Sequence, residues 1–269
     1  MNLDPVKGFV VSVTGAIGAI MSGISGLSPQ GALAPSLTWL VGSSREKARG
    51  TALFAAAVGA PVSAAVIMAR TGASATYLYL ALVSFLGATI GALVGVRTGP
   101  PRATRVPERV GALAGMAVTV YLMVQAAHLS KFNTDFHLYR STSASVVFLL
   151  AIAGGALTQV LGLTGGLAYL SIEYLFTGLT FHRVVLLSLL VIAIASALTV
   201  PASVRRGAVD QRYRGAVAAG CAVGGMIGGI VFALPAFTER AAIACSAVMG
   251  MFLCARELAT ARTDVPDTQ

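Results

Sequence analysis

Two short glycine-rich sequences interrupt apolar segments of this chain and carry most of its candidate binding groups. The first break reads Gly26-Leu-Ser-Pro-Gln-Gly31, and the second break reads Gly162-Leu-Thr-Gly-Gly166, which begins 136 positions later. The apolar run after each break holds roughly a dozen residues, whereas a helix that spans a membrane needs about 20. Paired interruptions at corresponding places of two halves are typical of the binding site of a membrane transporter.

The residues of the first break predict where a short helix begins. Serine is a preferred N-cap and proline is favoured at the first helical position, so Ser28 and Pro29 predict a helix from Pro29 to about Leu40. In the second break Thr164 takes the cap position. Each short helix would then direct free backbone N–H groups and the positive end of its dipole into the membrane. An anion is the natural partner for such groups.

Hydroxyl, amide and glycine residues around the two breaks are the predicted ligand contacts. Hydroxyls and amides can donate hydrogen bonds to an oxyanion, and glycine lets a ligand approach the backbone. The alternative is that these side chains only cap helices and bond between helices. The predicted substrate-binding residues are Ser25, Gly26, Ser28, Gln30, Gly31, Gln159, Gly162, Thr164, Gly165 and Gly166.

Glu173 is the clearest ionisable residue within an apolar run. It follows Leu167-Ala-Tyr-Leu-Ser-Ile and lies along the second short helix. A carboxylate in a membrane is costly and usually marks a proton or ion path, so Glu173 is the candidate for proton coupling. The alternative is an ion pair near the interface, with Arg183 as the partner. The corresponding residue of the first half is Leu37, so proton coupling would involve only one half.

Composition places the whole chain in a membrane. Of its 269 residues 56% are hydrophobic and 11% are charged, whereas a soluble domain has about 25% charged residues to wet its surface. Long apolar runs rich in glycine and alanine favour helices over a barrel. The net charge of +9 comes from short clusters between apolar runs, so it predicts orientation in the membrane and not nucleic-acid binding.

Other chemistry has no support in the sequence. Cys221, Cys245 and Cys254 lie inside apolar runs without a CxxC pair, which is typical of packing residues and not of a disulfide or metal site. No nucleophile–base pair and no phosphate-binding loop is found. We therefore expect no enzymatic activity, no cofactor and no metal.

The apolar runs form two sets of five, which predict an internal repeat. Residues 1–128 are the first transmembrane repeat, 129–142 a polar linker, 143–260 the second repeat and 261–269 a polar tail. Gly42 and Gly178, and likewise Leu53 and Leu189, correspond at the same offset of 136. The runs lie at about 8–27, 30–42, 50–69, 75–96 and 108–128, and then at about 143–161, 165–178, 184–204, 214–233 and 240–258.

An odd number of segments per half predicts that the second half enters the membrane inverted. If each short segment returns the chain to its starting side, the arginine-rich stretches 43–49, 97–109 and 205–214 all lie in the cytoplasm. This agrees with the positive-inside rule. Whether the segments 30–42 and 165–178 are re-entrant or spanning stays open at this point. The fold expected is an all-α polytopic membrane protein of two inverted repeats, each a broken or re-entrant helix pair plus three transmembrane helices.

Glycines spaced four residues apart recur in both halves. One run holds Gly87, Gly91 and Gly95, and the other holds Gly220, Gly224 and Gly228 at an offset of 133. Such spacing clears one helix face so that a neighbouring backbone can approach closely. These runs predict helix packing, not chemistry.

The duplicated motif resembles that of the TauE/SafE sulfite and sulfonate exporter family, also called the toluene-sulfonate uptake permeases. The resemblance covers nearly the whole chain, and it implies transport of sulfite, sulfonates, other organosulfur anions or related carboxylates. In the first half it lies in Gly26, Pro35, Gly42, Gly50, Thr51 and Leu53, and in the second in Gly162, Gly165, Gly166, Gly178, Ser188 and Leu189.

Together these observations predict a secondary transporter in a bacterial cytoplasmic (inner) membrane. Its partners would be a small anionic substrate, membrane lipid and, in the proton-coupled version, protons; no nucleic acid is expected and the oligomeric state is open. The alternatives are an anion channel, a membrane-embedded partner subunit without transport activity, and an intramembrane enzyme. The sequence does not select the anion or the direction of transport.

Overall fold

The computed structural model describes residues 5–72, 75–98, 106–127, 144–161, 163–177 and 179–263, and these residues form ten helices without a strand. The prediction of an all-α chain is confirmed. The helices are α1 (Pro5–Ser25), α2 (Gln30–Val41), α3 (Arg45–Thr71), α4 (Ala75–Thr98), α5 (Val106–Ala127), α6 (Ala144–Leu161), α7 (Leu163–Thr177), α8 (Phe181–Arg205), α9 (Arg214–Phe232) and α10 (Glu239–Thr263).

Apolar side chains cover the outside of the helix bundle. Five helices, α1, α3, α4, α8 and α9, contain segments that are long and apolar enough to cross a membrane. The outer face of α4 exposes large apolar residues at helical spacing, including Leu78, Leu82, Phe85, Leu86, Ile90 and Leu93. A soluble protein rarely exposes a contiguous apolar stripe of that length, whereas lipid is its natural solvent. The chain is a multi-pass membrane protein.

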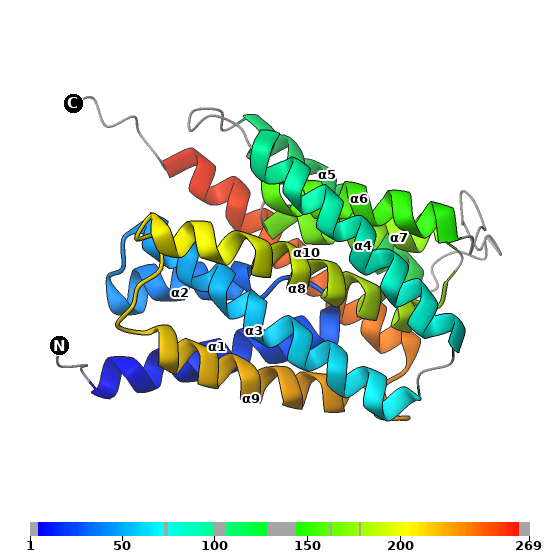
Figure 1. Ribbon diagram of the computed structural model, residues 1–269, viewed down its shortest axis with the longest axis horizontal. Coiled ribbons are helices and arrows are strands. Elements are labelled where there is room, and N and C mark those ends of the chain that lie inside the picture. Colours follow the sequence, from blue (N-terminus) through cyan, green and yellow to red (C-terminus); the bar gives the residue numbers. More distant parts are fainter. Residues whose placement is uncertain are drawn as a thin grey trace.

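The two halves pack through matching sets of contacts. Helix α1 packs on α9 and, correspondingly, α6 packs on α4. The packing of α3 on α9 is likewise matched by the packing of α8 on α4. In two further pairs, α3 with α8 and α5 with α10, each helix packs on its own counterpart in the other half. In Figure 1, α1 begins at the end where the N-terminus lies and α6 begins at the opposite end, so these two corresponding helices run in opposite directions. This is the arrangement expected of two inverted repeats.

Glycine spacing explains the two closest helix pairs. A Cβ at Gly224 would overlap the carbonyl oxygen of Ala16, which brings the backbones of α9 and α1 into contact. In the other half, a Cβ at Gly91 would overlap the carbonyl oxygen of Ile152 between α4 and α6. The prediction that these glycine runs serve helix packing is confirmed.

Helix α8 lies at the centre of the bundle, between the helices of the two halves (Figure 1). Its first four turns, from Phe181 to Ser196, are almost wholly buried. It also contacts α1, α3, α4, α6, α7 and α10, so it positions the short helix α7 directly, whereas the short helix α2 packs on α1 and α3.

Two predicted regions extend beyond what the structure describes. The linker 129–142 lies outside the described residues. The polar tail predicted from residue 261 begins as helix, because α10 continues to Thr263, and residues 264–269 lie outside the described part.

Candidate functional site

The first break separates α1 from α2 as the sequence predicts. Helix α1 ends at Ser25, and Gly26 follows with a φ of 70°, a left-handed conformation that favours glycine. The Ser28 hydroxyl accepts a hydrogen bond from the Gln30 amide at 3.4 Å. Pro29 is already helical, with φ −67° and ψ −11°, and its carbonyl accepts from Leu33. The N-cap position is Pro29 and α2 begins at Gln30, one residue after the predicted start, while the Ser28 hydroxyl accepts from a free amide of the first turn.

Serines from two distant helices hold the carbonyl groups of the first break. Ser188 of α8 donates to the carbonyl oxygen of Gly26 at 2.8 Å, and Ser246 of α10 donates to that of Ser25 at 2.8 Å. Both bonds are buried. The hydroxyl of Ser25 itself is used locally, because it donates to Met21 and accepts from Leu27. The Ser25 hydroxyl thus forms hydrogen bonds within the protein at the break, which is the alternative to ligand contact stated for these side chains.

The second break lies between two helices that pack on each other. Helix α6 is described to Leu161 and α7 from Leu163, and Gly162 lies outside the described residues. The prediction that Thr164 caps the second short helix is wrong, since Thr164 lies within the first turn of α7 together with Gly165. Threonine is tolerated inside a helix, and α7 begins two residues earlier than a cap at Thr164 would place it. Gln159 lies in the last turn of α6.

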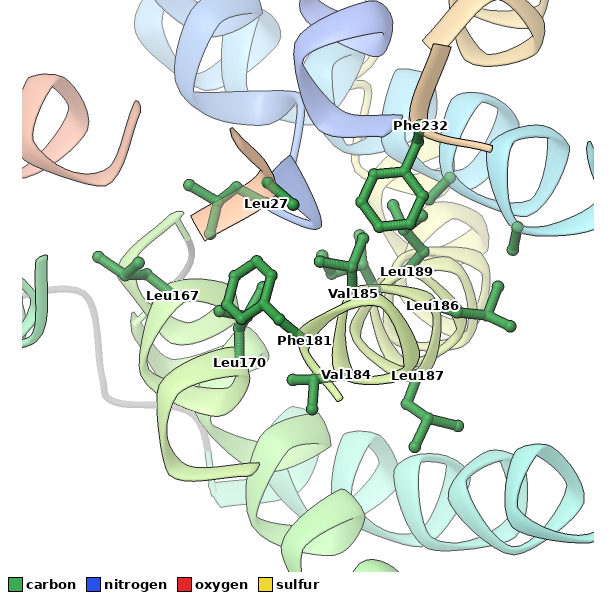
Figure 2. Close-up of a cluster of buried hydrophobic side chains, with 14 of the residues drawn as sticks. Leu27, Leu167, Leu170, Phe181, Val184, Val185, Leu186, Leu187, Leu189 and Phe232 are labelled. Carbon is green, nitrogen blue, oxygen red and sulfur yellow. The ribbon is translucent and has the colours of Figure 1, made fainter. Parts of the chain in front are cut away.

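The two breaks meet inside the bundle. A Cβ placed on Gly166 would lie 3.8 Å from the backbone nitrogen of Ser28 and 3.5 Å from Ile192 of α8. A Cβ on Gly26 would lie 2.8 Å from Leu170 of α7. Figure 2 shows Leu27 of the first break facing Leu167 and Leu170. Residues separated by almost 140 positions thus share one buried junction.

Backbone N–H groups at the start of α2 face this junction without complete pairing. The first four amides of a helix have no partner within it. Here Ser28 and Pro29 provide acceptors for the amides of Gln30 and Leu33, and the described residues supply no acceptor for those of Gly31 and Ala32. The Gln30 side chain is half-buried beside them. This end of α2 is therefore a source of positive electrostatic potential.

Helix α10 adds a cation at the same place. The guanidinium of the half-buried Arg256 donates to the carbonyl oxygen of Gly31. Leu253, one turn earlier, packs so closely on Gly31 that a Cβ there would overlap its side chain. The sequence reasoning missed Arg256, although an arginine near the end of the apolar run 240–258 was a usable signal. It also missed that Ser188 and Ser246 donate hydrogen bonds to the first break, because these bonds join residues far apart in the sequence and no local pattern predicts them.

Glu173 is fully buried, and neither of its carboxylate oxygens has a hydrogen-bond partner among the described residues. Arg183 is exposed, so the alternative of an ion pair between Glu173 and Arg183 is not what the structure shows. The physical reason is position: Arg183 lies in the first turn of α8, at the end of that helix, whereas Glu173 faces the packed interior. Its neighbour is Tyr169, one turn earlier on α7.

No family model, curated protein sequence or solved structure gives a significant match to this chain. The TauE/SafE resemblance stays a prediction that depends on the two motifs quoted above.

Proposed function

We propose that this chain is a secondary transporter that carries a small anion across the membrane, and that the anion binds where the first break meets the N-terminal turn of α7. The observation that carries the proposal is the approach of Gly166 to the Ser28 nitrogen, because it brings two helix N-termini together within a buried junction. The substrates we propose are sulfite, sulfonates and related small carboxylates, as the TauE/SafE resemblance implies. The location we propose is a bacterial cytoplasmic membrane.

Charge and hydrogen-bonding capacity at the junction favour an anion over a cation. The amides of Gly31 and Ala32 and the guanidinium of Arg256 are all donors. The hydrogen bonds to the first break from α8 and α10 come from Ser188, Ser246 and Arg256, and none of these is acidic. An oxyanion would therefore meet hydrogen-bond donors from both α2 and α10.

The inverted repeat supplies a mechanism for alternating access. Helices α2 and α7 are the short elements at the junction, and they belong to opposite halves. Rocking two rigid units of the bundle against each other would open the junction first to one side of the membrane and then to the other. The glycine-packed pairs α1 with α9 and α4 with α6 would be the cores of these units, and since each pair joins one helix from each half, the moving bodies would not be the two sequence halves themselves.

Gly166→Ala is the sharpest test, because the new methyl group fits the protein but occupies the junction. Its contacts, at 3.5 Å and 3.8 Å, are ordinary van der Waals distances, and alanine favours helix. Gly215→Ala is the matched control, since a Cβ there meets nothing within 4 Å. Purified protein in proteoliposomes is assayed for uptake of radiolabelled sulfite, taurine, methanesulfonate and acetate, with choline as the cation control.

We expect saturable uptake of at least one anion and no uptake of choline. Gly166→Ala should lower that uptake at least about tenfold with unchanged thermal stability, whereas Gly215→Ala should retain it. Uptake that rises without saturation would indicate a channel. Absence of uptake for every anion would favour a partner subunit, and wild-type uptake by Gly166→Ala would place the binding site elsewhere.

A further inference from the structure

Three polar side chains are buried together next to the junction without hydrogen-bond partners. They are Glu173 and Tyr169 on α7 and Ser84 on α4, each at most 1% exposed. Both oxygens of Glu173 and the hydroxyls of the other two residues lack a partner among the described residues. The Tyr169 hydroxyl lies near Glu173 and Ser84, although neither contact has hydrogen-bond geometry. We call these three residues the polar triad.

The corresponding place in the first half is filled by apolar side chains. At an offset of 136, Tyr169 and Glu173 correspond to Leu33 and Leu37, and at the offset of 133 that relates α4 to α9, Ser84 corresponds to Val217. These three apolar residues are buried in one cluster.

Packing on a glycine supports this correspondence between the halves. The Tyr169 ring packs on Gly154 of α6, just as Leu33 packs on Gly18 of α1, and these glycines also differ by 136 positions. The fold thus tolerates three apolar groups at this place, so the polar triad is not required for packing. Unpartnered polar groups in a membrane protein are costly, and they mark function by default.

Two members of the polar triad, Tyr169 and Glu173, lie on α7, the helix that forms one wall of the anion site. Glu173 follows Gly166 by seven residues, so it lies about two turns, roughly 10 Å, further along the same face of α7. Leu170 lies between them and contacts Gly26 of the first break. Any movement of α7 that opens the junction would therefore also change the surroundings of Glu173.

Among the described residues, no charged group around α7 pairs with the Glu173 carboxylate. Helix α6 contains no charged or titratable residue; the described ones on the other surrounding helices are Tyr79 on α4, Tyr121 on α5, Tyr174 on α7, His182, Arg183 and Arg205 on α8, and Glu239, Arg240, Cys245, Cys254 and Arg256 on α10. Among the described groups, Tyr169 is the one that acts on the carboxylate. A metal ion would require several more oxygen ligands, and no cluster of three or more acidic, histidine or cysteine residues exists among the described residues.

We propose that the polar triad is a proton-carrying site that couples anion transport to proton transport in the same direction. This inference depends on the proposed function. The Glu173 carboxylate takes up one proton from the water on one side and becomes a neutral carboxylic acid, and it releases that proton on the other side. The Tyr169 hydroxyl orients the carboxyl group, and Ser84 is next to the tyrosine. An ionised Glu173 repels an anion at the junction, so proton binding and anion binding favour each other.

The test compares two modes of transport in proteoliposomes. Exchange of labelled for unlabelled anion at equal pH on both sides does not require net proton movement, whereas accumulation driven by an inward pH gradient does. We expect Glu173→Gln to retain measurable exchange but to lose gradient-driven accumulation at least about tenfold, with a flat pH profile. Glu173→Asp should recover part of the accumulation. Glu239→Gln is the control carboxylate, and it should accumulate anion as the wild type does.

An independent readout separates this inference from the transport function. Infrared difference spectroscopy of the purified protein should show a carboxylic C=O band that appears and disappears between about pH 5 and about pH 9, and that is absent in Glu173→Gln. Tyr169→Phe should shift this band. The inference is overturned if no such band titrates, if Glu173→Gln accumulates anion like the wild type, or if Glu173→Gln also abolishes exchange. Absence of all anion transport with a titrating band would refute the transport function alone.

Discussion

Replacing Glu173 by leucine should stabilise this protein, although it removes its most deeply buried charged residue. Both carboxylate oxygens are without partners, and an unsatisfied buried polar group costs about 1–3 kcal/mol. Leucine is similar in volume, and a volume-conserving exchange in a core costs less than about 1.5 kcal/mol. The hydroxyls of Tyr169 and Ser84 stay unpartnered, so the gain is limited to the carboxyl group. We expect the free energy of unfolding to rise by about 1 kcal/mol, within a range of about 0–3 kcal/mol.

The mirror substitution in the first half provides the control. Leu37 is 1% exposed and packs with Leu33 and Val217 in an apolar cluster. Leu37→Glu loses the burial of an apolar side chain and introduces an unpartnered carboxyl group, so it should destabilise the protein by about 3 kcal/mol or more. The free energy of unfolding should therefore rise in Glu173→Leu and fall in Leu37→Glu, although the two positions correspond.

Both variants can be measured by SDS titration in mixed micelles followed by circular dichroism, and by thermal unfolding in detergent. A loss of about 1 kcal/mol or more in Glu173→Leu would refute the reasoning, because it would mean that the carboxyl group has a stabilising partner in the folded protein. A neutral outcome for Leu37→Glu would equally contradict it, since the first half would then accept a carboxyl group as readily as the second.

Three further predictions concern packing and the binding site. Gly224→Ala should destabilise the protein by about 1–3 kcal/mol, since its methyl group would force α9 from α1, while the control Gly215→Ala should be neutral or slightly stabilising in the same unfolding assay. Ser188→Ala should cost about 1–3 kcal/mol in that assay, because it leaves the buried carbonyl of Gly26 without its donor; an unchanged midpoint would contradict this. Arg256→Gln should raise the KM for the transported anion about tenfold or more in proteoliposomes, whereas a change in kcat alone would remove the arginine from the anion site.

The class of the fold follows from composition and spacing. A chain with 11% charged residues cannot cover a water-facing surface, so its helices must face lipid whatever their arrangement. The two runs of glycines spaced four residues apart, which contain Gly91 and Gly224 respectively, predicted close helix contacts, and the structure confirms these contacts. The start of α2 was also predictable to within one residue, because the cap preference of serine and the fixed φ of Pro29 act locally.

The start of α7 was not predictable from the same preferences. Threonine and glycine are weak signals, and the helix begins at Leu163 because backbone hydrogen bonds and packing outweigh a cap preference of about 1 kcal/mol. Similarly, the sequence placed Glu173 in an apolar run, but it could not decide between a partner and none.

The sequence by itself determined that the chain is helical and membrane-embedded, since those properties depend on composition and on local spacing, and it predicted the duplication and the broken segment of each half. The tertiary structure alone decided that the two breaks touch, that Ser188, Ser246 and Arg256 serve the first break, and that Glu173 is buried beside Tyr169 without an ion pair. The reason is physical. These contacts join residues up to 225 positions apart, and their geometry is set by how ten helices pack together, which no periodicity within one helix encodes.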